Sequence, residues 1–189
     1  MIFTYIANKI GGYWALRTKQ EKSSALGRKF YALIHKGFQY ETNSYLPFET
    51  TIKGSPNFLH GVFGIFISGG VSIGKNCTIY QQVTIGSNML IDSKGFGYPT
   101  IGDNCLIGAG AKIIGNVIIG DNCRIGANAV VTKNMPDNSV CVIGKSLILS
   151  DAILVNRIYQ KRKNNWGFME NGLFVKERDL DVLRKLSGE

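Results

Sequence analysis

The chain has 189 residues and a net charge of +9, with only 19% charged residues and 23 glycines. This length suggests one domain with appendages, and no stretch approaches the ~20 consecutive apolar residues that a membrane-spanning helix needs. No recognisable groove-entering element accompanies the positive charge, so we expect no nucleic acid partner.

Residues 1–40 are predicted to form an N-terminal helical segment, because aromatic and aliphatic residues recur three to four positions apart. The segment lacks a basic region before its apolar start and a small-residue cleavage site after it, so we expect a helix and not a signal peptide. It holds seven Lys or Arg and one acid, and therefore most of the excess charge. Two interpretations of this charge are open. The basic residues belong to a solvated helix face, or they attract an anionic partner such as a phosphorylated ligand or a membrane surface.

A six-residue repeat runs through residues 41–150. Aliphatic residues recur every six positions from Ile67 to Val131, often followed by Gly, and the series resumes at Ile143 and Leu149. Four positions after each aliphatic residue lies a second small or apolar residue. This period fits neither an amphipathic helix nor an alternating strand, but it fits flat segments joined by turns, three of which make one coil of a parallel β-helix. We therefore predict an all-β domain over residues 41–150.

One step of the repeat is longer than the others. It covers sixteen residues, from Ile85 to Ile101, so ten residues are inserted and the register is kept. The insertion lies within residues 87–99, which are polar and rich in Gly. Long loops on rigid scaffolds often carry function, so this loop is a candidate part of a site, and a tolerated surface insertion is the alternative.

The four cysteines fall at the second inward position of the repeat, at Cys77, Cys105, Cys123 and Cys141. We expect the last three to form a column of small core side chains in successive coils. No CxxC pair or Cys/His spacing indicates a metal site. Free thiols without a secretion signal favour a cytoplasmic protein.

Residues 151–189 are predicted to form a C-terminal helical extension, with one or two amphipathic helices around an aromatic turn. Helical ends of this kind would cap the β-helix, whose terminal coils otherwise expose backbone and core.

The repeats resemble those of the left-handed β-helix acyltransferases. Two stretches look closest to the serine acetyltransferase branch and its polysaccharide O-acetyltransferase relatives: HGVFGIFISGGVSIGKNCTIYQQVTIG (60–86) and PTIGDNCLIGAGAKIIGNVIIGDNCRIGANAVV (99–131). The resemblance implies a left-handed parallel β-helix, a homotrimer with sites between subunits, and acetyl-CoA as the donor without a metal.

Acetyl transfer to a hydroxyl needs a general base, and the chain has two His. His60 lies in a Gly-rich turn where the resembling family has its catalytic base, so we expect it to be catalytic. His35 lies in the helical segment, where we expect a packing or surface role. The resemblance and the loop give the candidates for binding the acceptor: Gln81, Asp92 and Tyr98.

The sequence also departs from the serine acetyltransferase pattern. Tyr98 stands where that family has a second His, and the Asp that orients the catalytic His falls near Asn43 or Ser44, with Glu41 and Glu49 as possible substitutes. These departures weaken the case for serine as the acceptor and leave acetyl transfer itself intact.

Two small-residue turns, GAGA and GANA, resemble those that line the pantetheine arm of coenzyme A in the family. The corresponding donor-binding candidates are Gly108, Ala109 and Ala127. Arg124 and Lys145 are candidates for binding the phosphates, or else solvated turn residues. The family's closing Gly-x-Pro-Ala-Lys/Arg motif is absent.

These features favour an acetyl-CoA-dependent O-acetyltransferase that modifies a sugar hydroxyl of a surface polysaccharide or its precursor. L-Serine is the second candidate acceptor, and a non-catalytic β-helix scaffold is a third interpretation. A metal-dependent hydratase on the same fold would need three ligating His per site, and two His in the chain argue against it.

Overall fold

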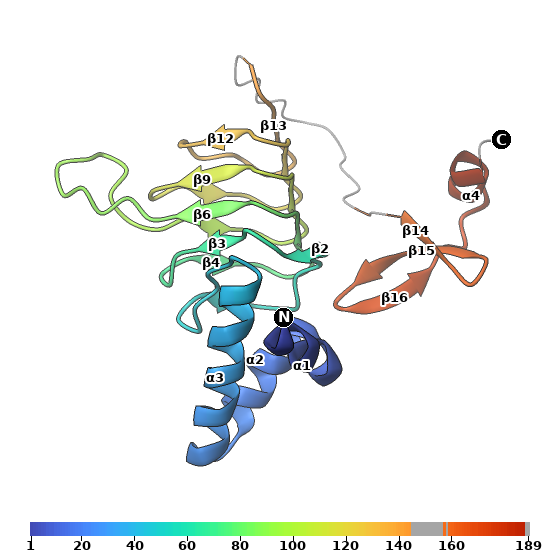
Figure 1. Cartoon of the computed structure of the whole chain (residues 1–189). Helices are drawn as coiled ribbons and strands as arrows, with labels where there is room; N and C mark the ends of the chain where they lie inside the picture. The colour runs from blue at the N-terminus through green and yellow to red at the C-terminus, as the bar shows by residue number, and fades with distance from the viewer. Residues whose placement is uncertain (145–156, 158, 188–189) are drawn as a thin grey trace.

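The computed structural model describes residues 1–144, 157 and 159–187. Figure 1 shows an N-terminal group of helices below a β-helix, and a small C-terminal sheet with one helix. No helix within these described ranges is long and apolar enough to cross a bilayer.

The N-terminal helices are α1 (Ile2–Ile10), α2 (Gly12–Lys22) and α3 (Ala25–Glu41), as the sequence predicts. Gly11 ends α1 in the left-handed conformation, which lets α2 begin at the next residue. Ser24 caps α3 by accepting a hydrogen bond from the backbone of Gly27. The three helices together form the N-terminal helical unit.

Buried Arg17 joins the helical unit to the first coil of the β-helix. Its guanidinium donates to the backbone oxygens of Phe48, at 3.0 Å, and Thr50, at 2.7 Å. It also pairs with Glu21 on its own helix, at 3.2 Å. Because a buried guanidinium without these partners would be costly, the contacts fix α2 against the coil.

The β-helix has three faces, each a parallel sheet of short strands stacked coil upon coil (Figure 1). Sheet A contains β3 (Phe66–Ile67), β6 (Thr84–Gly86), β9 (Lys112–Ile114) and β12 (Val130–Val131). Sheet B contains β1 (Thr51–Ile52), β4 (Ser72–Ile73), β7 (Thr100–Ile101) and β10 (Ile118–Ile119). Sheet C contains β5 (Thr78–Ile79), β8 (Leu106–Ile107), β11 (Arg124–Ile125) and β13 (Val140–Cys141). The predicted β-helix is confirmed, and with it the left-handed hexapeptide fold.

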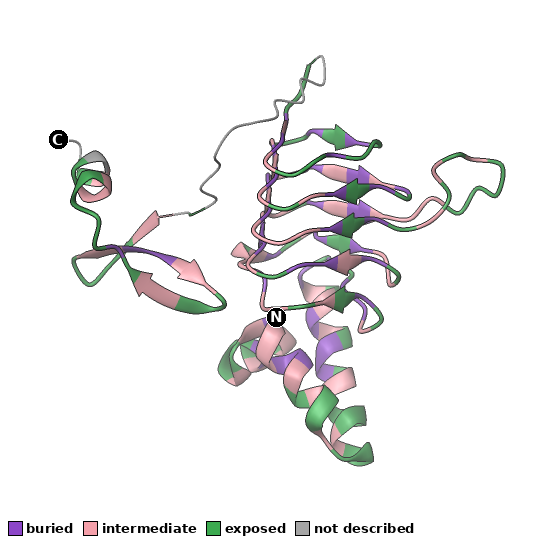
Figure 2. Cartoon of the chain, turned by 180° about the vertical axis from the view of Figure 1, so that it is seen from behind, coloured by how far each residue is buried: buried purple, intermediate pink, exposed green. Residues whose placement is uncertain are grey.

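The aliphatic residue of each repeat points inward. From Ile67 to Val131 these side chains are buried and form one continuous core, and Figure 2 colours the buried residues of each coil purple. Each strand pairs in register with the equivalent strand of the next coil, as in Ile79 with Ile107 and Ile107 with Ile125. Stacking therefore buries equivalent residues on one another.

A recurring four-residue phrase, GKNC at 74–77 and GDNC at 102–105 and 120–123, forms the corner of the coil between sheets B and C. Its Asn takes a positive φ at Asn76, Asn104 and Asn122, a conformation that Asn tolerates better than most residues. The Asp beside it accepts a backbone hydrogen bond from the previous coil, for example from Asp103 N to Asp121 Oδ1, at 2.6 Å. The phrase recurs because all three copies make the same turn, and the Asp of each of the last two copies accepts a hydrogen bond from the copy before it.

The prediction that Cys105, Cys123 and Cys141 form one column is correct for Cys105 and Cys123 and wrong for Cys141. Strand pairing aligns Cys77, Cys105, Cys123 and then Ser139, whereas Cys141 stacks on Ile125. The coil after Val131 is two residues shorter, since Met135 pairs with Ile119, and every later residue shifts by two. All four cysteines are buried thiols outside any disulfide. The Cys105 thiol beside it and burial raise the pKa of the Cys123 thiol.

The same shift leaves Ile143 with 65% of its surface exposed, so its predicted inward position is wrong. Leu149 lies outside the described residues.

The described part of the C-terminal extension contains one helix, but the described residues before it are strands where helices are predicted. An antiparallel sheet is formed by β14 (Tyr159–Arg162), β15 (Asn165–Glu170) and β16 (Leu173–Lys176), followed by α4 (Leu180–Ser187). Both connections have two residues with positive φ, Lys163-Asn164 and Asn171-Gly172. Asn-Gly is a strong hairpin signal, and it identifies a turn that the helical interpretation overlooks.

Candidate active site

The predicted base and three of the predicted donor-binding residues lie along one edge of the β-helix. We call this edge the C–A corner, the line of turns that connect each strand of sheet C to the next strand of sheet A. Successive coils place there residues 59–65, 80–83, 108–111 and 126–129. Because the coils stack in register, side chains far apart in sequence come together on this edge.

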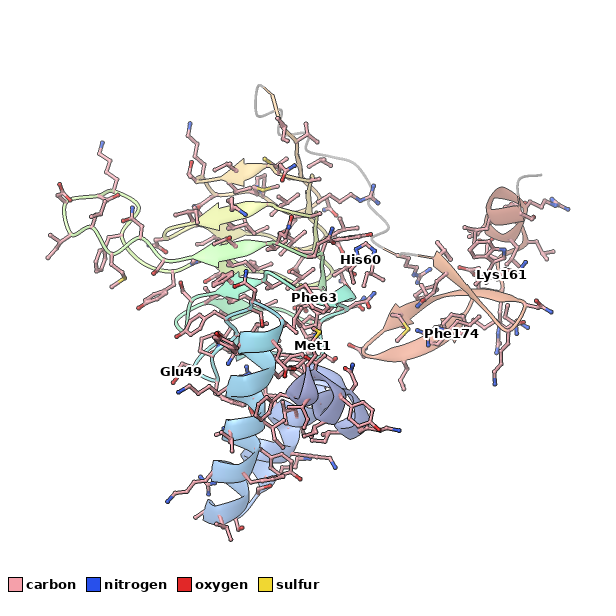
Figure 3. The ribbon with its side chains drawn as sticks, viewed as in Figure 1. Met1, Glu49, His60, Phe63, Lys161 and Phe174 are labelled. Carbon is pink, nitrogen blue, oxygen red and sulfur yellow. The ribbon has the colours of Figure 1, made fainter. Side chains whose placement is uncertain are left out.

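His60 lies on β2 (Leu59–Val62) at the start of the corner, with its ring exposed to solvent (Figure 3). Its Nδ1 atom lies 2.8 Å from Oε1 of Gln81. An amide oxygen only accepts hydrogen bonds, so this contact places the proton on Nδ1 and leaves the lone pair on Nε2. The ring of Tyr80 packs edge-on against the imidazole, with 5.5 Å between centroids. Residues of the second coil thus fix both the orientation and the tautomer of His60.

His35 has a different environment, inside the helical unit. Its ring is buried against Phe48, with 4.4 Å between centroids. Burial and the charge of Arg17 lower the pKa of His35 to about 4. The side chain is therefore neutral and enclosed, as expected for a packing residue.

Neither of the two carboxylates considered as partners for His60, Glu41 and Glu49, is hydrogen-bonded to its imidazole. Glu41 accepts hydrogen bonds from the backbone and hydroxyl of Thr4, both at 2.8 Å, at the start of α1. Although burial acts in the opposite direction, these bonds lower the pKa of Glu41 below its usual value. Glu49 lies against Gly69, on the turn between sheets A and B. The neutral amide of Gln81 stands where a carboxylate was expected.

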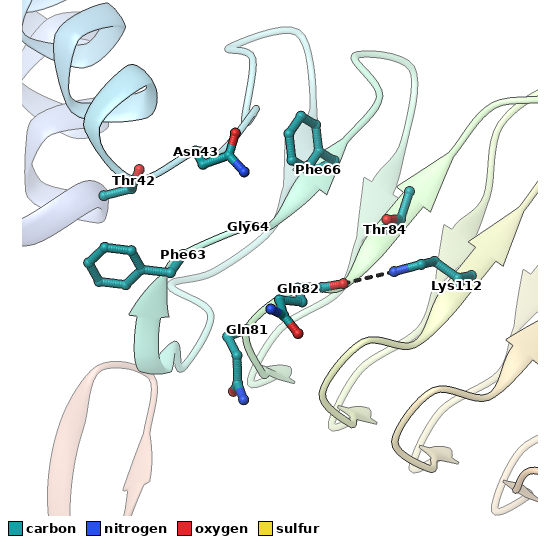
Figure 4. Close-up of a pocket in the computed structure, with 9 residues that line it drawn as sticks. All are labelled: Thr42, Asn43, Phe63, Gly64, Phe66, Gln81, Gln82, Thr84 and Lys112. Atoms are coloured by element: carbon teal, nitrogen blue, oxygen red, sulfur yellow. Dashed lines mark hydrogen bonds between the residues drawn. The ribbon is translucent and has the colours of Figure 1, made fainter.

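Beside His60 the surface is hollowed by a cavity of about 490 Å³ (Figure 4). Nine residues line it: Thr42, Asn43, Phe63, Gly64, Phe66, Gln81, Gln82, Thr84 and Lys112. The lining thus combines two aromatic rings with amides and hydroxyls, one Lys and no acid. Lys112 Nζ donates to the backbone oxygen of Gln82, at 3.0 Å.

Most of these lining residues are not predicted from the sequence. Phe66, Thr84 and Lys112 occupy the outward position of sheet A, next to the buried aliphatic residue in each coil. An exposed Phe at such a position is the signal that could have identified the hollow. Gln82 also has a φ of 61°, in the stacked turn position that Gly64 occupies one coil earlier with a φ of 65°.

The predicted donor-binding turns continue the corner upward from His60. Gly110 N donates to Gln81 O, at 3.0 Å, and Asn128 N donates to Ala109 O, at 2.8 Å. A Cβ atom at Gly108 would lie 2.6 Å from the nitrogen of Ala127, so the coils approach too closely for a side chain there. Neighbouring strands lie about 4.8 Å apart, so three coil steps from His60 to Ala127 cover roughly 14 Å. The result is a row of small residues leading away from the imidazole.

The two predicted phosphate-binding residues differ in what the structure describes. Arg124 lies on β11, two residues before the turn that contains Ala127, and its side chain is half-buried. Lys145 lies outside the described residues.

The predicted acceptor-binding residues of the loop lie on another edge of the chain. The loop leaves β6 at the A–B corner, the line of turns between sheets A and B, and its neck is closed by a bridge between Asn88 and Gly97. Tyr98 packs at this corner, where a Cβ atom at Gly70 would meet its ring at 2.6 Å. Asp92 is exposed in the projecting part of the loop (Figure 1). Within one chain, neither residue comes to His60.

The described residues contain no group of three or more His, Cys, Asp or Glu placed to hold a metal ion.

Comparisons with known proteins agree with this architecture. Residues 98–133 match the family model "Bacterial transferase hexapeptide (six repeats)". A serine acetyltransferase of Staphylococcus epidermidis is 50% identical over 58 residues, which cover 31% of this chain and 26% of that protein.

Among solved structures, serine acetyltransferase isoform 3 of Entamoeba histolytica in complex with cysteine is 33% identical with a TM-score of 0.53, covering 65% of this chain and 44% of that one. Soybean serine acetyltransferase complexed with serine is 27% identical with a TM-score of 0.57, covering 71% and 53%.

The chain thus spans about a quarter of the curated relative and about half of each solved chain. The chain is therefore similar in sequence and structure to serine acetyltransferases over part of their length, and residues 98–133 of its β-helix match a bacterial transferase hexapeptide model.

Proposed function

We propose that this protein is an O-acetyltransferase that moves the acetyl group of acetyl-CoA to a hydroxyl group. One observation carries the proposal: an exposed imidazole, fixed by Gln81 at 2.8 Å, lies at the start of a row of small residues. The similarity of the β-helix to serine acetyltransferases supports the same reaction class.

His60 is proposed as the general base. Its Nε2 atom accepts the proton of the acceptor hydroxyl while the hydroxyl oxygen attacks the thioester carbonyl carbon. The C–S bond then breaks, and the imidazolium returns the proton to the departing thiolate, so that the products are the acetyl ester and free coenzyme A. Gln81 holds the proton on Nδ1 through both transfers, so Nε2 can accept and donate.

The C–A corner fits the donor. Ala109 and Ala127 leave a flat surface along the coils, and the roughly 14 Å from His60 to Ala127 suits an extended pantetheine arm. We propose that Gly108, Ala109 and Ala127 contact this arm, and that Arg124 and Lys145 contact the phosphates of coenzyme A.

L-Serine is the acceptor that the comparisons favour, because the matching proteins are named for acetylating serine. The sequence alone favours a sugar hydroxyl as the first candidate acceptor and serine as the second, and the comparisons reverse this ranking. No comparison supports a polysaccharide acceptor, and we propose L-serine as the first acceptor to test.

The lining of the hollow beside His60 supports a neutral sugar hydroxyl as a second candidate acceptor. An amino acid carries an ammonium and a carboxylate, and charged ligands of this kind are usually met by opposite charges. The described lining has one Lys and no acid, whereas its two Phe rings, amides and hydroxyls suit a neutral polyol.

We further propose that the working form is a homotrimer with a shared site. Asp92 and Tyr98 lie on a different edge from His60, so they can contribute to acceptor binding only beside the C–A corner of another copy. We propose that the enzyme acts in the cytoplasm, where thiols such as those of its four cysteines stay reduced.

A thiol-release assay tests the proposal. Purified protein is supplied with acetyl-CoA and L-serine, or with a panel of neutral monosaccharides, and free coenzyme A is measured with time. Acceptor-dependent release supports the enzyme, and the acceptor with the larger kcat/KM identifies the substrate class. No turnover with any acceptor, together with no coenzyme A binding by calorimetry, would favour the non-catalytic scaffold instead.

A further inference from the structure

The free end of α3 exposes a short apolar stripe. Leu26, Phe30 and Leu33 are 80%, 59% and 61% exposed, and their spacing of four and three residues places them on one helix face. Figure 1 shows this end of α3 projecting away from the β-helix, and in Figure 2 the same end is coloured mainly as exposed. No described element of the chain covers the stripe.

Lysines border the stripe on the same helix. Lys29 lies three residues after Leu26 and four before Leu33, and Lys36 lies three residues after Leu33. Both are exposed, so their ammonium groups stand beside the apolar side chains. Lys19 and Lys22 at the end of α2 add two exposed cations near the same tip.

The acids of the helical unit do not balance this charge. Residues 1–41 contain two acids, Glu21 and Glu41. Glu21 pairs with Arg17, and Glu41 binds Thr4 and the N-terminal ammonium at the start of α1. The outer surface of the unit therefore carries a positive charge with no acid at the stripe.

A second copy of the chain fits this surface poorly. A coiled coil needs an apolar seam of three to four heptads. Here the row stops at Gly37, where a Cβ atom would lie 2.3 Å from the ring of Phe3, so α1 already covers that position. Two facing stripes would also bring Lys29 and Lys36 of each copy toward those of the other.

We propose that the stripe and its bordering lysines bind the surface of an anionic lipid membrane. Apolar side chains enter the boundary between headgroups and acyl chains while lysines meet the negative headgroups, which is the usual arrangement of an interfacial amphipathic helix. The charge complementarity selects this occupant, and the proposal does not depend on the acetyl acceptor.

Vesicle flotation tests the proposal with the full-length protein. Vesicles of phosphatidylcholine with one third phosphatidylglycerol are compared with pure phosphatidylcholine, at low and high salt. We expect binding to the anionic vesicles alone, and at least a fivefold loss of the bound fraction in high salt.

Two kinds of variant separate the apolar and electrostatic contributions. Phe30→Asp with Leu33→Asp should abolish binding, and Lys29→Gln with Lys36→Gln should reduce it by about tenfold. The lysine variants leave the apolar side chains in place, so they report on the proposal even if the aspartate variants fail to fold. Leu180→Asp, at an equally exposed Leu on α4, is the matched control and should bind as the wild type does.

Two outcomes would overturn the proposal. Equal or absent binding to both vesicle types would exclude an anionic membrane as the partner. A fall in oligomer mass on Phe30→Asp with Leu33→Asp, measured by light scattering without vesicles, would assign the stripe to contacts between copies.

Discussion

The C–A corner and the A–B corner are built by the same six-residue repeat, yet they differ in what they present. At the C–A corner the coils place His60, Gln81, Ala109 and Ala127 along one edge of the chain. At the A–B corner the loop between Asn88 and Gly97 projects from the β-helix (Figure 1). One edge therefore offers a fixed base and a row of small residues, and the other offers a projecting polar loop.

The two corners illustrate two ways in which a stack of coils can position the residues of a site. Side chains aligned by strand register are positioned within one chain, since each coil is fixed by backbone bonds to the next. A loop that leaves the coil is not bound by that register and can reach beyond its own chain. The proposed enzyme uses the first edge for proton and acetyl transfer and the second for the acceptor of a neighbouring copy.

Removing the imidazole is expected to have the largest effect on the C–A corner. His60→Ala should lower kcat by on the order of 10²–10⁴, because no other described side chain at this corner can take the hydroxyl proton. Thiol release under saturating substrates measures it. Lys133→Ala, an exposed change away from the corner, should keep wild-type kcat, and full activity of His60→Ala would contradict the assignment of the base.

Mixing two inactive proteins tests whether the corners of different copies work together. One partner carries His60→Ala, and the other carries Asp92→Ala with Tyr98→Ala, which should raise KM for the acceptor strongly. In trimers formed from equal amounts, about one quarter of the sites would combine an intact base with an intact loop from the next copy. We expect co-refolded mixtures to recover activity toward that fraction at low acceptor concentration.

The same experiment can contradict the proposal that base and loop meet between copies. If mixtures show no more activity than the sum of the separate proteins, base and loop do not meet across copies. Native mass spectrometry of the co-refolded mixture, which separates the two variants by subunit mass, establishes that mixed trimers have formed.

Much of the β-helix could be predicted because its determinants are local and periodic. The aliphatic series from Ile67 to Val131 specifies the core, and the single step of sixteen residues between Ile85 and Ile101 locates the loop. The prediction fails beyond Val131, because a coil two residues shorter keeps the fold while shifting Met135 and Cys141 in register. A period alone cannot show such a deletion when the residues on either side are also small or apolar.

The candidate site could be predicted only in part, for a related reason. His60 stands out by residue type, and the small turns at Ala109 and Ala127 by the repeat. The contact between His60 and Gln81 joins residues 21 apart and depends on coil register, which fixes one residue above another. The hollow depends on outward side chains such as Phe63 and Phe66, which have no periodic signature.

Filling the row of small residues should have a smaller effect than removing the base. Ala109→Leu is expected to raise KM for acetyl-CoA by about tenfold with little change in kcat, because the side chain would occupy the surface proposed for the pantetheine arm. Calorimetry with coenzyme A should show a similar loss of affinity. Val130→Leu, an outward change on sheet A away from this row, is the matched control. An unchanged KM for acetyl-CoA in Ala109→Leu would contradict binding of the donor at this part of the corner.

The smallest expected effect concerns the neutral partner of His60. Gln81→Glu keeps an acceptor at the position of Oε1 but adds a negative charge, which favours the protonated imidazole. The neutral base is then available only at higher pH, so the acid limb of the kcat/KM profile should move upward by about one pH unit, with activity restored above it. Gln82→Glu adds the same charge at the next residue, which lines the hollow without contacting His60, and should shift the limb less. Equal shifts in the two variants would mean that Gln81 acts through general electrostatics and does not hold the imidazole.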